Sequence, residues 1–257
     1  MPKRKRNSSP EATRRTNAPK SKKVQGRSLG ENKATAKKPA ASPKILHKTL
    51  AKFNPKLRSA AEIKTALASS SSFSSTDCGN PLTKFKGQVQ AQGNWCWAAV
   101  AASIADYYDN KDWIKQCIVA SASIPTSGQD CCKTPSSTAC NVTVLDIGIP
   151  LTRTQNRGGP AWLHTLPPII DVMTNINNCK PIAVGINWLS GPAKGNGHAV
   201  AIIGYDVSDP AHFKLIIWDP SNDVSGGQKT VDYAAFSTQY NGQTISIEDC
   251  VSTQPQP

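Results

Sequence analysis

The sequence predicts an α+β fold in which a helical half is followed by an antiparallel sheet. Apolar residues recur at helical spacing within residues 97–108 and again within 168–179, where a proline near the start suits a first helical turn. After residue 180 the pattern changes to short apolar runs rich in β-branched residues, separated by loops that contain glycine or proline. These runs predict an antiparallel meander, with strands at residues 181–186, 198–205 and 213–219.

The first 76 residues carry most of the positive charge. The chain of 257 residues has a formal net charge of +13. Residues 1–76 hold 19 Lys and Arg residues and 3 Glu, a net charge of +16, whereas residues 77–257 hold 11 Lys and Arg residues and 14 Asp and Glu residues, a net charge of −3. We therefore expect one folded domain at residues 77–252, followed by a short disordered C-terminus at 253–257.

Residues 1–43 are expected to form a disordered basic tail. They are rich in Lys, Arg, Ser, Pro and Ala and contain almost no large apolar residues, so they cannot build a core. Basic runs such as residues 3–6 are typical of nucleic-acid contacts or nuclear import signals. The tail is therefore a candidate for contact with nucleic acid or an acidic surface, and a solvated, non-specific tail is the alternative.

Residues 44–76 combine an amphipathic helical segment with a Ser-rich linker at residues 69–76. The helical segment has one apolar stripe, formed by Leu46, Leu50, Phe53 and Leu57. Such a stripe needs a surface to cover it. The segment is thus either a pro-segment that docks on the domain or an interaction helix used for targeting, and both alternatives stay open.

The cysteines favour disulfide bonds, which form in oxidising compartments. All eight cysteines lie after residue 77. If Cys96 is unpaired, seven remain, so at least one further cysteine is either unpaired or bonded to another molecule. A structural zinc site is the rival interpretation, but no C-x-x-C motif occurs and the adjacent Cys131-Cys132 pair suits metal ligation poorly. We expect no cofactor or metal, and we expect loops and short helices stapled by disulfides within residues 116–141.

The sequence shows no membrane span and no secretory leader. No apolar run approaches the roughly 20 residues that cross a bilayer, and the first 30 residues contain no apolar core of a signal peptide. We expect a soluble monomer. Abundant cysteines without a leader are reconciled by export along a route that needs no signal peptide, and a cytoplasmic protein is the alternative.

Further elements are predicted with weaker patterns. Residues 151–166 are polar and glycine-containing and are expected to be an exposed loop. Residues 227–249 are expected to add one strand, a short helix near residues 233–236 and a last strand near 244–247.

Cys96 lies between two tryptophans, directly before the first predicted helix. We expect it at or just inside the helix N-terminus, with Asn94 as the cap. There the unpaired N–H groups and the helix dipole stabilise a thiolate, which is the nucleophilic form of cysteine. The alternative is a structural role, because free cysteine often behaves as a small buried hydrophobe.

His198 opens the second predicted strand and has a candidate partner in Asp219. A symmetric turn centred on Ser208–Asp209 places His198 directly opposite Asp219, with both side chains on one face and about 5 Å apart at Cβ. A carboxylate there would hold the imidazole in one tautomer, as in a nucleophilic triad. The alternative is a structural His–Asp pair, and a slip of one residue would separate the two side chains.

Together these motifs resemble the papain-like cysteine peptidases. Gln90 precedes Cys96-Trp97 by six residues, and His198 begins a strand that reads His-Ala-Val-Ala-Ile-Ile-Gly-Tyr. The closer resemblance is to compact bacterial members with a Trp-Cys-Trp-Ala-Ala core, some of which are effectors delivered into host cells. It spans residues 85–240 and includes three further landmarks of those members, Gln116-Cys117, Cys131-Cys132 and Cys140-Asn141.

The resemblance implies a papain-like fold, in which a helical subdomain that carries the cysteine helix packs on an antiparallel β-sheet subdomain that carries the histidine and the aspartate. It implies that Cys96 is the nucleophile and that His198 acts first as general base and then as general acid. Gln90 would donate a side-chain N–H to the oxyanion hole, together with the backbone N–H of Cys96. Gln92 is a less expected donor.

One position departs from papain itself. Papain orients its histidine with an asparagine inside an Asn-Ser-Trp-Gly motif, whereas this chain has Trp218-Asp219-Pro220 at the corresponding place. The compact bacterial members use an aspartate there. The resemblance therefore implies that Asp219 orients His198.

Two classes of function follow from the sequence. The first is a cysteine endopeptidase that hydrolyses a polypeptide through a Cys-His-Asp triad; deamidation, acyl transfer and isopeptide cleavage on the same residues stay open. The second is a non-catalytic, disulfide-stapled binding module whose basic tail contacts nucleic acid or an acidic surface. The peptidase is favoured because a binding module has no need of the complete set, Gln90, Cys96, His198 and Asp219.

Overall fold

A computed structural model describes residues 78–257, apart from 125–127 and 210, and all of the described residues belong to one compact unit. The expectations for residues 1–76 lie outside the described residues. The elements, in chain order, are α3 (Cys96–Tyr107), η1 (Lys111–Trp113), α4 (Gln116–Ser123), α5 (Gly148–Arg153), β1 (Arg157–Leu163), α6 (Ile169–Asn177), β2 (Ile182–Trp188), β3 (Gly197–Asp206), β4 (Lys214–Asp219), β5 (Gly227–Asp232), α7 (Tyr233–Phe236), β6 (Gln239–Tyr240) and β7 (Gln243–Thr253).

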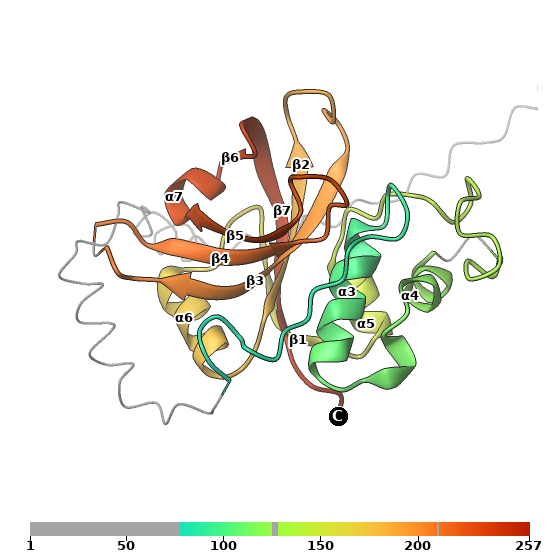
Figure 1. The fold of residues 1–257 in the computed structure, drawn as a ribbon, viewed down its shortest axis with the longest axis horizontal. Helices are drawn as coiled ribbons and strands as arrows, with labels where there is room; N and C mark the ends of the chain where they lie inside the picture. The colour runs from blue at the N-terminus through green and yellow to red at the C-terminus, as the bar shows by residue number, and fades with distance from the viewer. Residues whose placement is uncertain (1–77, 125–127, 210) are drawn as a thin grey trace, which may run out of the picture. The chain divides into compact units, whose positions relative to one another are not determined.

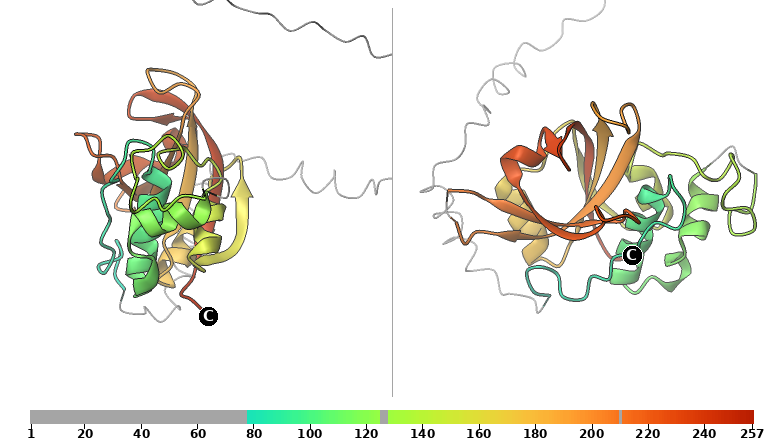
Figure 2. Two further views of the ribbon diagram at one scale, coloured as in Figure 1. Left: turned by 90° about the vertical axis from the view of Figure 1, so that its right-hand side faces the viewer. Right: turned by 45° about the horizontal axis from the view of Figure 1, so that its top comes forward.

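The strands form one antiparallel sheet with the order β1-β7-β2-β3-β4-β5, and β6 pairs with β7. Consecutive pairing of β2, β3 and β4 confirms the predicted meander. The C-terminal strand β7 inserts between β1 and β2, and the sheet is strongly curved (Figure 2). The mixture of helices with an antiparallel sheet confirms an α+β fold.

The helices cover both faces of the sheet. Figure 1 shows α3, α4 and α5 on one side, and α6 and α7 on the other. Alternate residues of β3 point to the two sides, since Val200 belongs to the hydrophobic cluster that contains α6, whereas Ala199 and Ala201 belong to the cluster that contains α3. These alanines are small, so α3 lies close to the sheet. Its residues from Cys96 to Ala105 are all buried, as expected for a helix that is apolar on every side.

One predicted loop is wrong. Residues 151–166 contain the end of α5 and the whole of β1, an edge strand that pairs with β7. Its Gly158 and Gly159 disguise it, because glycine is depleted in strands. The glycine at 158 is needed for close approach, since an added Cβ would lie 2.7 Å from the backbone of Thr253.

The C-terminal boundary also differs from the prediction. β7 continues to Thr253, whose side chain is fully buried, and the N–H of Gln254 donates to the carbonyl of Asn156. The ordered chain therefore extends past residue 252, where the domain was expected to end.

Six of the eight cysteines form three disulfides, Cys78–Cys179, Cys117–Cys132 and Cys131–Cys140. The other two, Cys96 and Cys250, are free and buried, in agreement with the expectation that at least one cysteine besides Cys96 has no disulfide partner within the chain. Within the described part of the chain, no helix is both long enough and apolar enough to cross a membrane.

Candidate active site

Cys96 is the first residue of α3, and only 4% of its surface is exposed. The first-turn N–H groups of a helix, here including that of Cys96, have no acceptor within the helix. The predicted cap is wrong. Trp95 is the residue at the cap position, without a side-chain cap bond, and Asn94 is engaged elsewhere. Its backbone N–H and its side-chain amide both bond Asn141, so a tertiary partner replaces the local one.

The two tryptophans beside Cys96 are anchored to the disulfide-stapled segment that follows α4. The indole of Trp95 donates to the carbonyl of Cys140 at 2.8 Å, and the indole of Trp97 donates to the carbonyl of Val142 at 3.0 Å. With the two bonds of Asn94, four hydrogen bonds join residues 94–97 to residues 140–142. The start of α3 is therefore held on both flanks of the thiol.

Gln116 holds the loop that leads to Cys96. Its side-chain oxygen accepts from the N–H of Ala91 at 2.8 Å, and its side-chain nitrogen donates to the carbonyl of Val89 at 2.8 Å. Both bonds are to the backbone, so Gln116 fixes the path of the chain around Gln90. The N–H of Gln90 in turn donates to the carbonyl of Pro220, directly after β4, at 2.7 Å.

The sheet supplies His198 and Asp219. The Nε2 atom of His198 lies 2.9 Å from Oδ1 of Asp219, and 10% of the His198 side chain and none of the Asp219 side chain is exposed. The indole of Trp188 stacks on the imidazole, with ring centroids 5.9 Å apart. The imidazole is thus fixed by a carboxylate at one nitrogen and by an aromatic ring on one face.

The predicted register of this hairpin is wrong, although the two side chains meet. Asp219 was expected directly opposite His198, but the observed pairing of Ala201 with Trp218 continues to Val200 opposite Asp219. The difference is two residues, which preserves the face, so His198 is a diagonal neighbour of Asp219.

A β-bulge makes this arrangement possible. Beyond the bulge, Gly204 pairs with Ile216. If that register continued without a bulge, Asp219 would lie opposite Ala201, on the face of the sheet that α3 covers. The extra residue, Ile203, shifts the pairing by one and returns Asp219 to the face of His198. The carbonyl of Ile203 is satisfied by the N–H of Leu82 at 2.8 Å.

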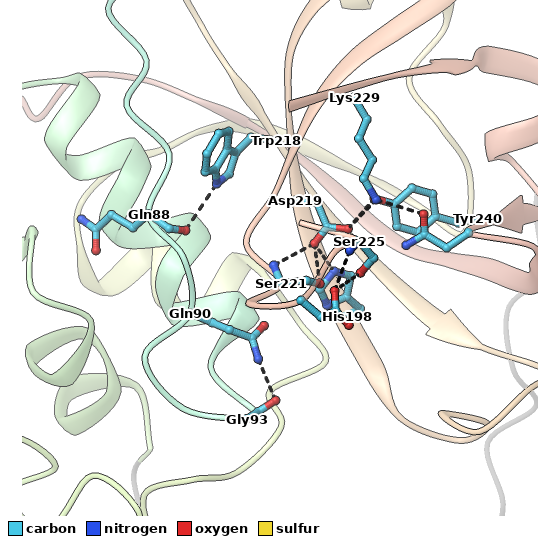
Figure 3. A network of polar contacts seen from close by, with 12 residues as sticks. Gln88, Gln90, Gly93, His198, Trp218, Asp219, Ser221, Ser225, Lys229 and Tyr240 are labelled. Carbon is cyan, nitrogen blue, oxygen red and sulfur yellow. Dashed lines mark hydrogen bonds and ion pairs between the residues drawn. The ribbon is translucent and has the colours of Figure 1, made fainter. Parts of the chain in front are cut away.

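Both oxygens of Asp219 are occupied (Figure 3). Besides His198, Oδ1 accepts from the N–H of Ser221 at 2.9 Å and from its hydroxyl at 2.7 Å. On the other side, Oδ2 accepts from the hydroxyl of Tyr240 and lies 3.6 Å from Nζ of Lys229. These contacts stabilise an ionised carboxylate in one orientation.

Contact between His198 and Asp219 raises the pKa of the imidazole and lowers the pKa of the carboxyl group. Burial disfavours the imidazolium, but the hydrogen bond and charge of Asp219, with the neighbouring Cys96, outweigh burial and raise the pKa of His198 to about 10. Burial likewise disfavours the carboxylate, but His198 outweighs it and holds the pKa of Asp219 well below its usual range. At neutral pH the pair is therefore an imidazolium and a carboxylate.

Gln90 lies on the opposite wall from His198 (Figure 3). Its side-chain nitrogen donates to the carbonyl of Gly93 at 2.8 Å and to that of Gln92 at 3.1 Å. Both amide hydrogens are thus used within the loop. A cavity of about 490 Å³ lies between the two walls. Its lining includes Gln90, Gly93, Cys96, Asn196, His198 and Ser221.

Comparison with protein families assigns the chain to a known family. Residues 82–245 match the model of the Peptidase_C39 like family, and this range is well over half of the chain. The chain belongs to the peptidase C39-like family. No curated protein matches the chain. Membership in the C39-like family supports cysteine peptidase activity and a polypeptide substrate.

Several residues of this candidate site were not predicted from the sequence. Ser221 had a detectable signal, because an Asp followed two residues later by Ser commonly forms a local side-chain turn. Tyr240 had none, since it lies on β6 and reaches Asp219 only when the sheet curves. Lys229 lies on the neighbouring strand β5, two residues from the direct partner of Asp219, and the register that places it there was not predicted. Gln116 was noted as a landmark, but its function as a clamp on the Gln90 loop follows from the hydrogen bonds.

Proposed function

We propose that the protein is a cysteine endopeptidase with a papain-like mechanism, and that it is related to the compact bacterial members with a Trp-Cys-Trp-Ala-Ala core. The observation that carries the proposal is the shared cavity, in which Cys96 at a helix N-terminus meets a His198 whose far nitrogen is held by Asp219. The bonds from the two tryptophans to residues 140 and 142 support the relationship, because they join two of its sequence landmarks.

The reaction begins when the sulfur of Cys96 attacks the carbonyl carbon of the scissile peptide bond. A C–S bond forms, and the carbonyl oxygen becomes an oxyanion. As the tetrahedral intermediate collapses, the C–N bond breaks and the imidazolium of His198 gives its proton to the leaving amine. His198, now neutral, takes a proton from water, which attacks the thioester. The C–S bond then breaks and the acid product leaves.

The oxyanion hole is proposed to combine the backbone N–H of Cys96 with the side chain of Gln90. The helix N-terminus contributes a positive partial charge where negative charge develops. Gln90 has both amide hydrogens on loop carbonyls in the substrate-free protein. Its donation therefore requires that one of these two bonds be exchanged for the oxyanion when substrate binds.

Thiol alkylation tests the proposal without a known substrate. Treatment with iodoacetamide at pH 6 is expected to modify Cys96 rapidly, because cysteines at helix N-termini and beside an imidazolium are the reactive ones, and Cys96 begins α3 and shares its cavity with His198. The second free thiol, Cys250, is an internal control, since burial raises its pKa and keeps it unreactive. Mass spectrometry of the peptides identifies the labelled cysteine. A Cys96 that reacts no faster than an ordinary thiol would favour the non-catalytic binding module instead.

Removal of the Gln90 side chain is expected to lower kcat/KM by about 100-fold, the usual effect of losing one oxyanion donor. Cleavage of a peptide library, followed by mass spectrometry, measures the change. Gln92→Ala is the matched control and should cleave like the natural protein. Unchanged cleavage by Gln90→Ala would mean that backbone N–H groups form the oxyanion hole alone.

A further inference from the structure

The carboxylate of Asp219 is held at both ends by different parts of the chain. Its Oδ1 atom receives His198 and Ser221, and its Oδ2 atom receives Tyr240 and Lys229. Ser221 is a near neighbour in sequence, but Lys229 comes from β5 and Tyr240 from β6. The contacts on Oδ2 therefore depend on the fold of the whole sheet.

We infer that Tyr240 and Lys229 are positioning residues, which orient and charge-balance Asp219 so that its other oxygen holds His198 in the reactive tautomer. The inference rests on the proposed peptidase function. It assigns a task to two side chains that the triad and the oxyanion hole leave without one.

Tyr240 is a rigid donor. It is 3% exposed, and its ring stacks on Trp188 with centroids 6.0 Å apart, while Phe236 meets it edge-on at 5.3 Å. Trp188 also stacks on the imidazole of His198. Burial and the nearby Asp219 raise the pKa of Tyr240, so the hydroxyl keeps its proton and donates it to Oδ2. Trp188 thus packs against both Tyr240, which donates to Asp219, and His198, which bonds the other oxygen of Asp219.

Lys229 adds a charge to the same oxygen. Its Nζ atom lies 3.6 Å from Oδ2, over the ring of Tyr240 at 5.2 Å from the centroid, and it donates to Oδ1 of Asn241 at 3.0 Å. Its side chain is 22% exposed, so water screens this ion pair less than one on the open surface. A cation there offsets part of the negative charge that His198 experiences.

The effect on the reaction has a definite sign. Two titratable groups act directly on His198, Asp219 from β4 and Cys96 from α3. Lys229 and Tyr240 contact the far oxygen of Asp219, and Asp223 lies on the loop that follows β4. Loss of the Lys229 charge, or of the Tyr240 hydrogen bond, strengthens the hold of Asp219 on the imidazolium. His198 then releases its proton to the leaving amine less readily, and it loses its proton only at higher pH.

The effect should fall on kcat rather than on KM. As far as the described residues define it, the cavity that holds Cys96 and His198 is not lined by Tyr240 or Lys229. Substrate binding is therefore expected to stay within about twofold of the natural protein, whereas the loss of a hydrogen bond to a charged group lowers kcat by about 10- to 100-fold.

Tyr240→Phe and Lys229→Met test the inference in the full-length protein. Tyr240→Phe keeps the stacked ring and removes only the hydroxyl, and Tyr233→Phe is its matched control, because the Tyr233 hydroxyl donates to the carbonyl of Pro167, a backbone group outside the triad. Lys229→Arg keeps the charge and should restore most of the activity lost in Lys229→Met. The expected results are a lower kcat, an unchanged KM and a basic limb of the kcat/KM profile shifted to higher pH.

A second measurement is independent of peptide cleavage. The proton between His198 and Asp219 should give a strongly deshielded NMR resonance, and Tyr240→Phe should move it, whereas Tyr233→Phe should not. If the natural protein cleaves peptides and both variants match it in kcat and in this resonance, the inference is wrong and the peptidase proposal stands. If no cleavage is found, the peptidase proposal fails, and an unmoved resonance overturns the positioning of Asp219 as well.

Discussion

Replacement of Cys96 by alanine is expected to abolish peptide cleavage while the fold remains intact. The substitution removes the nucleophile, and loss of a nucleophile lowers turnover by about 10,000-fold or more. The thiol is buried but small, so its removal costs on the order of 1 kcal/mol, which shifts the melting temperature by about 2–4 °C in a domain of this size. Cleavage of the peptide library and a thermal melt measure the two effects separately.

Cys250→Ala is the matched control, because Cys250 is the other free and buried cysteine. It should melt at a similarly lowered temperature and retain full cleavage. A further signature concerns His198, whose pKa is raised in part by Cys96. In Cys96→Ala this pKa should fall, as an NMR titration of the imidazole would report. Residual cleavage by Cys96→Ala at more than a few per cent of the natural rate would remove Cys96 from the mechanism.

The elements around these two residues were largely predictable, because each has a strong local pattern. The apolar residues of 97–108 face the same core, and α3 was found where they indicate. The strands β2, β3 and β4 are continuous apolar runs because the sheet is covered on both faces. Edge strand β1 has no such pattern, since only one of its edges is paired and its Gly158 serves close approach to β7.

The contact between His198 and Asp219 shows where local reasoning ends. Counting back from a symmetric turn correctly places the two residues on one face of the sheet, but the strand register that it assumes differs from the observed one. The observed contact depends on the bulge at Ile203, and isoleucine is an ordinary strand residue that signals no bulge. Its carbonyl is satisfied by Leu82, far away in the sequence, so the bulge is a tertiary feature.

Asn94 illustrates the same limit at a helix end. Its residue type and its position just before the helix favour a cap. In the folded chain, Asn141 offers two acceptors, its side-chain oxygen and its backbone carbonyl, and Asn94 donates to both instead. The result is a link between the nucleophile loop and the stapled segment, which a capping rule based on neighbouring residues has no means to detect.

Replacement of Asp219 by alanine is expected to lower kcat/KM by about 100-fold or more, since the imidazole loses the group that selects its tautomer. Asp219→Asn should be tolerated better, because its amide oxygen still accepts a hydrogen bond from Nε2 of His198. The control is Asp209→Ala, which breaks an exposed pair of the same kind, 2.7 Å between Asp209 and His212 in the same hairpin, and should leave cleavage unchanged.

The pH profile gives the sharper test of Asp219. In the natural protein the pKa of His198 is raised to about 10, so cleavage should persist at alkaline pH and decline only near that value. Burial alone lowers the pKa of a histidine, and the hydrogen bond to Asp219 is the largest single contribution that opposes burial here. In Asp219→Ala the basic limb should therefore move to lower pH, opposite to the shift expected for Lys229→Met. An Asp219→Ala variant with the natural rate and the natural profile would leave Asp219 as a structural partner of His198 and end its place in the triad.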